Sequence, residues 1–207
     1  MNEQLLKMNG LSVGILDALS FESHLGIPLK KNLHYFDKDL LIAELISMTE
    51  WLDEQEILSG IALDYRVKSL DSILLKYDRY YPDHQTRKVF NDILGFRAFC
   101  DSYDQILEEE SVQFRIADMS SGKAVDDGYR GVHVYYQKSG KYYPIEIQFN
   151  TLFDRQLNNW LHDYLYKKDY PIETGRILRE KYESGLIRNE HEFKEVLNNV
   201  LFGSKRS

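Results

Sequence analysis

Polar side chains alternate with apolar ones in two short segments near the middle of the chain. Segment 128–136 carries His133 between two valines, and segment 145–151 carries Glu146, Gln148 and Asn150 between large apolar residues. This period-2 pattern predicts two strands, each with one buried face, and Gly140 between them predicts the turn of a β-hairpin. The polar face is either an ordinary solvated surface or the floor of an active site, and the pattern alone leaves both interpretations open.

A second acidic side chain interrupts an apolar run from Val89 to Cys100, which is typical of a central strand buried on both faces. Asp92 must therefore be paired, bound to a metal or placed at the strand end, because an unpaired buried carboxylate is costly. Together with Glu146 it could hold Mg²⁺, which prefers oxygen ligands and keeps phosphate oxygens and waters in its shell.

Cations and a hydroxyl accompany these acids. We predict a helix that begins at Arg66 and places Lys68, Ser72 and Lys76 at i, i+4 and i+8 on one face. This face is either solvated or a binding surface for a polyphosphate. Arg66 favours the second interpretation, because the planar guanidinium group fits the geometry of phosphate oxygens. Metal, cations and an acceptor-activating group are the parts that phosphoryl or pyrophosphoryl transfer needs. Neither a P-loop nor a Gly-x-Gly-x-x-Gly dinucleotide motif is found.

Composition sets the class of protein. The 207 residues, 43% hydrophobic and 29% charged, are typical of a soluble globular protein. A single cysteine, Cys100, excludes a disulfide framework and a Cys-rich zinc site, and with no signal-peptide pattern it favours the cytoplasm. We expect no membrane segment, because no apolar run approaches about 20 residues. The net charge of -7 disfavours general nucleic-acid binding. Lys30 and Lys31 on a connector are either solvated surface or a local contact for a phosphate backbone.

The remaining patterns predict mostly helices. We expect a helical region at 1–60, a core at 61–170, and C-terminal helices with a tail at 171–207, all in one compact domain. The predicted elements are one or two short helices in 1–26, a helix at 37–58 with Asp37 as N-cap, a helix at 101–110, a strand at 112–117, a polar loop at 118–128, a helix at 152–168, and two helices in 173–201.

Five motifs in this order resemble the synthetase domain of the RelA/SpoT family, over about residues 64–168. They are Arg66-x-Lys68 with Ser72, Asp92-Ile-Leu-Gly-Phe-Arg97, Gly128-Tyr-Arg-Gly-Val-His133, Glu146-Ile-Gln-Phe-Asn-Thr151, and Trp160-Leu-His162 with Tyr166-Lys167. The resemblance implies an α+β fold, with a mixed sheet of about five strands flanked by helices, related to nucleotidyltransferases and extended by helices at both ends. It also implies transfer of pyrophosphate from ATP to a ribose 3′-hydroxyl.

The resemblance also assigns roles to individual residues. Those implied to bind the phosphates of ATP are Arg66, Lys68, Ser72, Lys76 and Arg97, with Lys123 near the position of a family lysine. Asp92 and Glu146 would bind Mg²⁺, and Glu146 could help to deprotonate the acceptor. Tyr129 would stack on the acceptor base and take part in catalysis. The acceptor site would further include His133, Gln148, Asn150 and His162, with Lys30 and Lys31 farther out.

Two departures concern the acceptor. Gly131 and Asn150 stand where alarmone-making members usually carry Ser and Arg. The chain is most similar to toxic small alarmone synthetases, which implies the 3′-terminal adenosine of tRNA as acceptor, inhibition of translation, and an antitoxin as partner. The alternatives are a synthetase of (p)ppGpp or (p)ppApp that acts on a free guanosine or adenosine nucleotide, and an inactive nucleotide-binding regulatory protein.

Overall fold

The computed structural model describes residues 3–108, 112–168 and 170–203. Contacts divide the chain into two compact units. Unit 1 consists of Met1–Ala98, Asp104–Ala117 and His133–Phe149, and unit 2 consists of Phe99–Tyr103, Asp118–Val132 and Asn150–Ser207. These boundaries differ from the predicted segments, because the chain passes several times from one unit to the other. The expectation of one compact domain stays a prediction.

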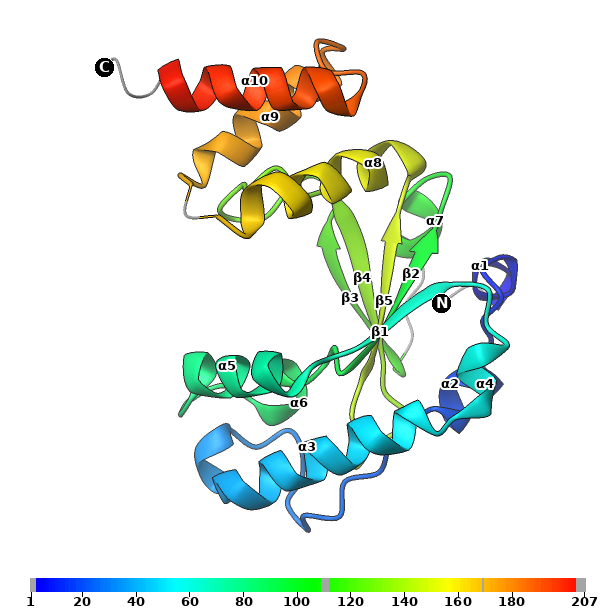
Figure 1. Ribbon diagram of the computed structural model, residues 1–207. Helices are drawn as coiled ribbons and strands as arrows, with labels where there is room; N and C mark the ends of the chain where they lie inside the picture. Colours follow the sequence, from blue (N-terminus) through cyan, green and yellow to red (C-terminus); the bar gives the residue numbers. More distant parts are fainter. Residues whose placement is uncertain (1–2, 109–111, 169, 204–207) are drawn as a thin grey trace. The chain divides into compact units, whose positions relative to one another are not determined.

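A five-stranded sheet has the strand order β1-β2-β5-β4-β3. The strands are β1 (Asp64–Val67), β2 (Leu94–Phe99), β3 (Phe114–Met119), β4 (Gly131–Tyr136) and β5 (Ile145–Asn150). β1 pairs antiparallel with β2, with Arg66 opposite Gly95 and Asp64 opposite Arg97. The adjacent positions of β4 and β5 confirm the predicted hairpin. With its flanking helices, this mixed sheet has the predicted α+β class (Figure 1).

The buried face of the hairpin agrees with its alternating sequence. Val134 and Tyr136 of β4 are fully buried, as are Ile145, Ile147 and Phe149 of β5. Because side chains alternate across a strand, the polar residues between them lie on the opposite face of the sheet. That face carries the residues singled out for chemistry.

Unit 1 contains the helices of the first half of the chain. They are α1 (Glu3–Met8), α2 (Val13–Ala18), α3 (Lys38–Asp53), α4 (Glu56–Ser59), α5 (Leu70–Tyr80), α6 (Thr86–Val89) and α7 (Asp104–Leu107), with a 3₁₀ turn at Leu33–Tyr35. α3 packs against α5 and β1 (Figure 1). Of the helix predicted at 101–110, residues 109 and 110 lie outside the described residues, as do tail residues 204–207.

The helix predicted from Asp37 to Leu58 is interrupted. Asp37 is the N-cap as predicted, because its carboxylate accepts a hydrogen bond from the Leu40 N–H at 3.0 Å. α3 nevertheless ends at Asp53. The Gln55 side chain donates to the Trp51 carbonyl at 2.8 Å, which satisfies one of the free carbonyls of a helix end.

The prediction that one helix carries both Arg66 and Lys68 is wrong. Arg66 belongs to β1, and the Lys68 N–H donates to the Ile93 carbonyl at 2.8 Å, so pairing with the segment before β2 overrides the helical pattern. α5 begins only at Leu70, and it carries Ser72 and Lys76 one turn apart. The strand predicted from Val89 is also shorter, since α6 occupies its start and Asp92 lies just before β2.

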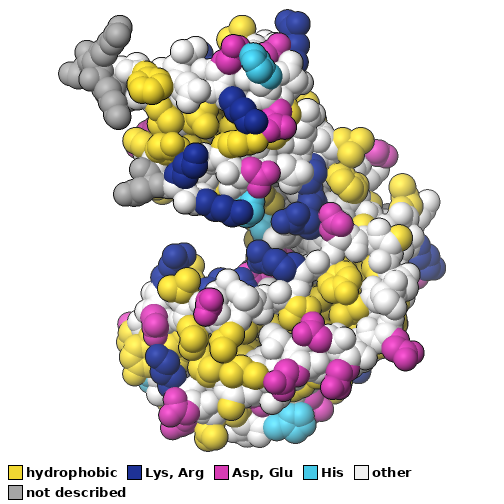
Figure 2. Space-filling model, in the orientation of Figure 1, with side chains coloured by type: hydrophobic (Ala, Val, Ile, Leu, Met, Phe, Trp, Pro, Cys, Tyr) yellow, Lys and Arg dark blue, Asp and Glu magenta, His cyan; other side chains and the backbone are white. Residues whose placement is uncertain are grey.

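Unit 2 is mainly helical. Its helices are α8 (Leu152–Leu161), a π-helical turn (His162–Tyr166), α9 (Glu173–Glu183) and α10 (Glu190–Gly203). Leu157, Leu161, Leu178 and Phe193 form its buried core. Figure 2 shows further hydrophobic side chains gathered on the surface of these helices. Among the described residues, no helix has both the length and the apolar character needed to cross a membrane.

Candidate active site

Asp92 is held by two lysines in unit 1. Its Oδ2 lies 2.6 Å from Nζ of Lys68, and its Oδ1 lies 2.9 Å from Nζ of Lys76. The Lys68 and Asp92 side chains are only 8% and 13% exposed. Lys68 directly follows strand β1, Lys76 belongs to α5, and Asp92 lies in the segment before β2. The pairing therefore satisfies the sequence-based requirement that this carboxylate be paired or lie at a strand end.

The cluster of Lys68, Lys76 and Asp92 has one positive charge in excess. Burial lowers the pKa of Lys68, and the neighbouring Asp92 carboxylate opposes this effect by favouring the charged ammonium. Lys76 also donates to the Val89 carbonyl at 3.0 Å, which fixes its direction. An excess cation in a partly buried setting attracts an anion more strongly than a solvated lysine does.

Glu146 is the second acid, on β5, and it is 5% exposed. Its Oε1 lies 3.0 Å from Nδ1 of His133, and its Oε2 accepts a hydrogen bond from the Gln148 amide at 2.6 Å. Burial alone would raise the pKa of Glu146. Hydrogen bonds from His133, Gln148 and Tyr135 outweigh burial and hold that pKa below its usual value. Glu146 is therefore ionised at neutral pH.

Tyr135 connects the two acids electrostatically, and the sequence analysis did not select it. Burial raises its pKa, the bonded Glu146 carboxylate raises it further, Arg115 opposes the rise, and the charge of Asp92 adds to it. The Arg115 guanidinium lies 4.1 Å from the centre of the Tyr135 ring. The signal was present in the sequence, because Tyr135 follows His133 at the strand period on the same face.

Gly95 is another residue that sequence reasoning passed over. A Cβ at this position would lie 3.4 Å from Oε2 of Glu146, in van der Waals contact with it. Gly95 thus shares the sheet face of Glu146, and its pairing partner Arg66 does so too, because directly paired residues project to the same side. Arg97 is two residues farther along β2 and lies on the same face. Arg66 and Arg97 are both exposed there.

The structure thus brings many of the predicted site residues together in unit 1. The Asp92 cluster contains Lys68, Lys76 and Asp92. The sheet face of Glu146 carries further predicted residues of this unit's site: Arg66, Arg97, His133, Glu146 and Gln148. Ser72 lies in the first turn of α5, with its Oγ 3.0 Å from Oγ of Ser69.

Lys30 and Lys31 lie on the connector between α2 and α3. Lys31 lies over the ring of Tyr35, 5.1 Å from its centre. Lys30 lines a cavity of about 570 Å³ together with Arg87 and Lys141, while Glu22 supplies its one acidic side chain among the described residues. The lining of the cavity therefore carries an excess of positive charge. Among the described residues, no hydrogen bond joins a residue of this lining to Asp92 or Glu146.

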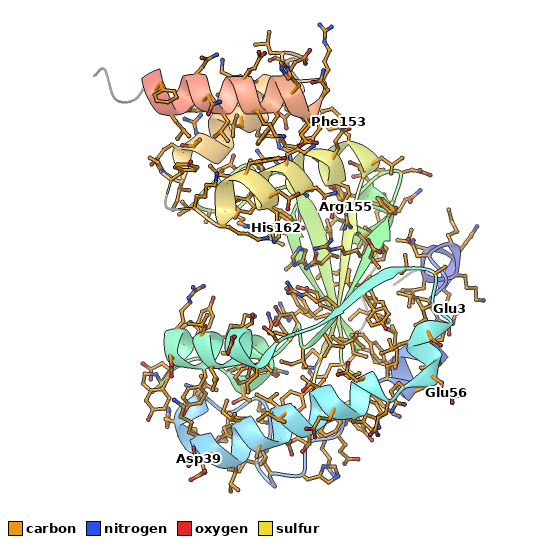
Figure 3. The ribbon with its side chains drawn as sticks, viewed as in Figure 1. Glu3, Asp39, Glu56, Phe153, Arg155 and His162 are labelled. Carbon is orange, nitrogen blue, oxygen red and sulfur yellow. The ribbon has the colours of Figure 1, made fainter. Side chains whose placement is uncertain are left out.

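Four other predicted residues belong to unit 2. Lys123 binds Asp127 at 2.6 Å and lies over the ring of Tyr129, 4.9 Å from its centre. Asn150 is 2% exposed, and its amide donates to the Arg130 carbonyl at 2.8 Å. His162 is exposed where α8 ends, with Nδ1 3.2 Å from Asp163 (Figure 3). The ATP-binding role of Lys123 and the acceptor roles of Tyr129, Asn150 and His162 stay predictions.

The donor set fits Mg²⁺ in kind. Mg²⁺ is usually held by one or two carboxylates, with phosphate oxygens and waters in the remaining positions. Asp92 and Glu146 each keep lone pairs beyond the hydrogen bonds that they accept. No cluster of three or more His, Cys, Asp or Glu side chains suited to a metal occurs in the part of the chain that the structure describes. The other ligands would therefore come from substrate and water.

The chain was compared with curated proteins, solved structures and protein families. No curated protein sequence matches the chain. Among solved structures, the small alarmone synthetase 1 from Bacillus subtilis bound to its product pppGpp is 26% identical, with 78% of this chain and 90% of that chain covered and a TM-score of 0.43. A GTP pyrophosphokinase family protein from Streptococcus pneumoniae is 23% identical, with 81% and 93% covered and a TM-score of 0.41.

The same Bacillus subtilis enzyme bound to AMPCPP is 23% identical, with 80% and 94% covered and a TM-score of 0.38. These TM-scores are below 0.5, so the assignment rests on the family model. The model of the region found in RelA/SpoT proteins matches residues 65–170, just over half of the chain. That span contains both carboxylates and the five motifs. The chain therefore belongs to the RelA/SpoT family.

Proposed function

We propose that this protein is a Mg²⁺-dependent pyrophosphokinase, and that it transfers the β,γ-pyrophosphate of ATP to the 3′-hydroxyl of the terminal adenosine of tRNA. The acceptor oxygen forms a new bond to the β-phosphorus, and the bond from the β-phosphorus to the α,β-bridging oxygen breaks, so that this oxygen leaves on AMP. The proton of the acceptor hydroxyl passes to Glu146 or to water. The observation that carries the proposal is the Asp92 carboxylate held between Lys68 and Lys76.

On the donor side, Lys68 and Lys76 bind the phosphates of ATP. Asp92 fixes both ammonium groups in place, and together they carry one more positive charge than Asp92 neutralises. The two lysines therefore need to move little as negative charge develops on the leaving phosphate. Arg66 and Arg97, exposed on the Glu146 face of the sheet, add planar donors for the phosphates or the adenine. We also propose that Ser72 and Lys123 bind the phosphates of ATP.

On the acceptor side, Glu146 orients the attacking hydroxyl. Its lowered pKa keeps it ionised, which suits a hydrogen-bond acceptor and a metal ligand. The same low pKa makes it a weak general base, because an efficient base has a pKa near the working pH. We therefore assign it orientation first and proton abstraction second. A Mg²⁺ ion held by Asp92 and Glu146 would neutralise phosphate charge and acidify the acceptor hydroxyl.

Two features support tRNA as the acceptor. Gly131 and Asn150 replace residues that the alarmone-making members carry, and Asn150 is buried against the Arg130 carbonyl, so this position offers a free nucleotide no cation. Lys30 and Lys31 could contact phosphodiesters beside the acceptor end. We include in the proposal inhibition of translation as the toxin of a toxin–antitoxin pair. The net charge of -7 implies that tRNA affinity depends on a small basic surface and falls steeply with salt.

A free guanosine or adenosine nucleotide is the second candidate acceptor, because the motifs around Asp92 and Glu146 resemble those of the alarmone-making members of the family. In that case the product would be (p)ppGpp or (p)ppApp. A catalytically inactive nucleotide-binding protein is disfavoured, since simple binding has no need for both Asp92 and Glu146.

One labelling experiment tests these alternatives. The protein is incubated with β-labelled ATP, Mg²⁺ and, in separate reactions, intact deacylated tRNA, tRNA trimmed of its terminal adenosine, GDP, GTP and ATP alone. We expect label on intact tRNA only. Label on GDP, GTP or a second ATP with none on tRNA would overturn the tRNA acceptor, and no transfer to any acceptor would overturn the pyrophosphokinase itself.

A further inference from the structure

Two glycines of unit 2 touch backbone to backbone. Gly128 precedes Tyr129 and has a φ of +87°, which L side chains rarely adopt. A Cβ on Gly128 would lie 2.3 Å from the carbonyl oxygen of Gly175 in α9, and a Cβ on Gly175 would lie 1.9 Å from the carbonyl oxygen of Asp127. No side chain fits between these segments, so α9 and the loop before β4 are in direct contact.

Arg179, one helical turn after Gly175, fixes the same loop. It is 1% exposed and is among the largest fully buried side chains of the described residues. Its Nε donates to the Gly128 carbonyl at 2.9 Å, and its two terminal nitrogens donate to Asp154 at 2.6 Å and to Asn158 at 3.3 Å. A buried guanidinium with an ionic partner and several acceptors is oriented rigidly.

The rest of the loop is held in the same way. The Arg130 carbonyl accepts from Asn150 at 2.8 Å and from Asn158 at 2.7 Å. The Tyr129 N–H donates to the Asp127 carboxylate at 3.1 Å. The Tyr166 hydroxyl donates to the Asp127 carbonyl at 3.2 Å. Residues from α8, the π-helical turn and α9 thus fix the backbone on both sides of Tyr129.

We propose that Gly175 and Arg179 are positioning residues for acceptor binding, because they hold the loop from Asp126 to Arg130 and thereby the ring of Tyr129 in one conformation. This inference rests on the proposed function for the role of Tyr129. A ring fixed in advance binds a base without the cost of ordering the loop. Neither residue contacts substrate in this account, and both act through Tyr129.

The first test compares Gly175→Ala with Gly203→Ala. An alanine at 175 must push the loop away, whereas a Cβ at Gly203 in α10 meets nothing within 4 Å. We expect Gly175→Ala to lower kcat/KM for the acceptor by about 100-fold, the cost of a displacement of about 1 Å, with KM for ATP unchanged. Gly203→Ala should behave as wild type. Equal loss for ATP and acceptor would overturn the positioning role.

The second test asks whether Gly175 acts through Tyr129. In a double-mutant cycle, Gly175→Ala should have no further effect on acceptor kcat/KM once Tyr129→Ala is present, because the ring that it misplaces is gone. A general loss of folded protein would instead reduce the activity of the Tyr129→Ala variant by the same factor as that of wild type. Additive effects would therefore contradict the proposal.

The third test does not require activity. Arg179→Lys keeps the charge beside Asp154 but loses the fork that reaches both Gly128 and Asn158, and Arg176→Lys on the exposed side of α9 is its control. We expect hydrogen exchange of the Tyr129 and Arg130 amides to accelerate about tenfold in Arg179→Lys and Gly175→Ala, with α10 unchanged. The milder Tyr166→Phe should show a smaller acceleration.

These readouts separate two kinds of failure. Unchanged loop exchange in the variants overturns the structural part of the inference, even if the wild type transfers pyrophosphate. Accelerated loop exchange with intact acceptor kinetics overturns its functional part. A wild type that transfers nothing, with accelerated exchange in the variants, overturns the proposed function while the hold of α9 on the loop stands.

Discussion

Nζ of Lys68 lies 2.6 Å from Oδ2 of Asp92, and water reaches little of either side chain. Replacement of one member of a buried ion pair leaves the other without compensation, at a typical cost of about 3 to 5 kcal/mol. Because Lys76 remains beside Asp92, we expect Lys68→Met to lower the free energy of unfolding by about 3 kcal/mol. Urea denaturation measures this change, with the exposed Lys88→Met as control. If Lys68→Met and Lys88→Met lowered the free energy of unfolding by the same small amount, the pair of Lys68 and Asp92 would add no stability.

The two carboxylates should dominate turnover. We expect Asp92→Asn and Glu146→Gln each to lower kcat for pyrophosphate transfer by about a thousandfold, which is typical when a charge that stabilises the transition state is lost. The exposed Asp53→Asn and Glu56→Gln are matched controls in charge and chemistry (Figure 3 labels Glu56). Steady-state rates at saturating Mg²⁺ measure the change in kcat. If the Asp92 and Glu146 variants were as active as the controls, the proposed catalytic role of the two carboxylates would be wrong.

Lys68 should also set an alkaline limit on ATP binding. Since burial lowers its pKa from 10.5, the folded protein loses this proton at a lower pH than an ordinary lysine does. ATP affinity should therefore begin to fall below pH 10.5 in the wild type. Arginine stays charged throughout this range, so Lys68→Arg should have a flatter profile. Calorimetric titration with a non-hydrolysable ATP analogue compares the two, and parallel profiles would exclude Lys68 as the titrating group.

Tyr129 should contribute through its ring. Stacking on a base is worth about 1 to 3 kcal/mol, so Tyr129→Ala should lower acceptor kcat/KM by about 5- to 150-fold. Tyr129→Phe keeps the ring and reports on the hydroxyl alone. The same kinetics in wild type and both variants would remove Tyr129 from the acceptor site.

Lys30 and Lys31 should matter for tRNA only. We expect the double change Lys30→Glu with Lys31→Glu to abolish labelling of tRNA at moderate salt while ATP binding stays intact, because phosphate contacts supply affinity through counterion release. Lys7→Glu with Lys194→Glu makes the same charge change at lysines already paired with glutamates. If both double variants lose tRNA labelling to the same extent, net charge and not this lysine pair governs binding.

Short-range patterns predicted a large part of the fold. The alternation along β4 and β5 predicted the hairpin because a strand exposes every second side chain to one face. Asp37 was recognised as an N-cap, and Asp92 was expected to be paired or at a strand end, since either feature follows from neighbouring residues. The helix through Arg66 and Lys68 was wrong because pairing with β2 is a long-range contact that local periodicity does not contain.

The candidate site was predicted less completely, for the same reason. The acids and cations carry their chemistry in their types, so they could be selected from the sequence. Their partners could not: nothing local joins Asp92 to Lys76, or Glu146 to Tyr135. Gly175 and Arg179 were missed altogether, because the loop that they touch lies far back in the chain and a single glycine or arginine in a helix has no pattern of its own.

The contact between Arg179 and Gly128 joins residues 51 positions apart. During synthesis, chains begin to fold from the N-terminal side, so the lysine cluster around Asp92 can assemble while α9 has yet to be made. The contact by which Arg179 holds the loop that carries Tyr129 can form only after the ribosome has added residue 179. If Tyr129 binds the acceptor as proposed, the acceptor side of the site is therefore completed later in synthesis than the lysine cluster around Asp92.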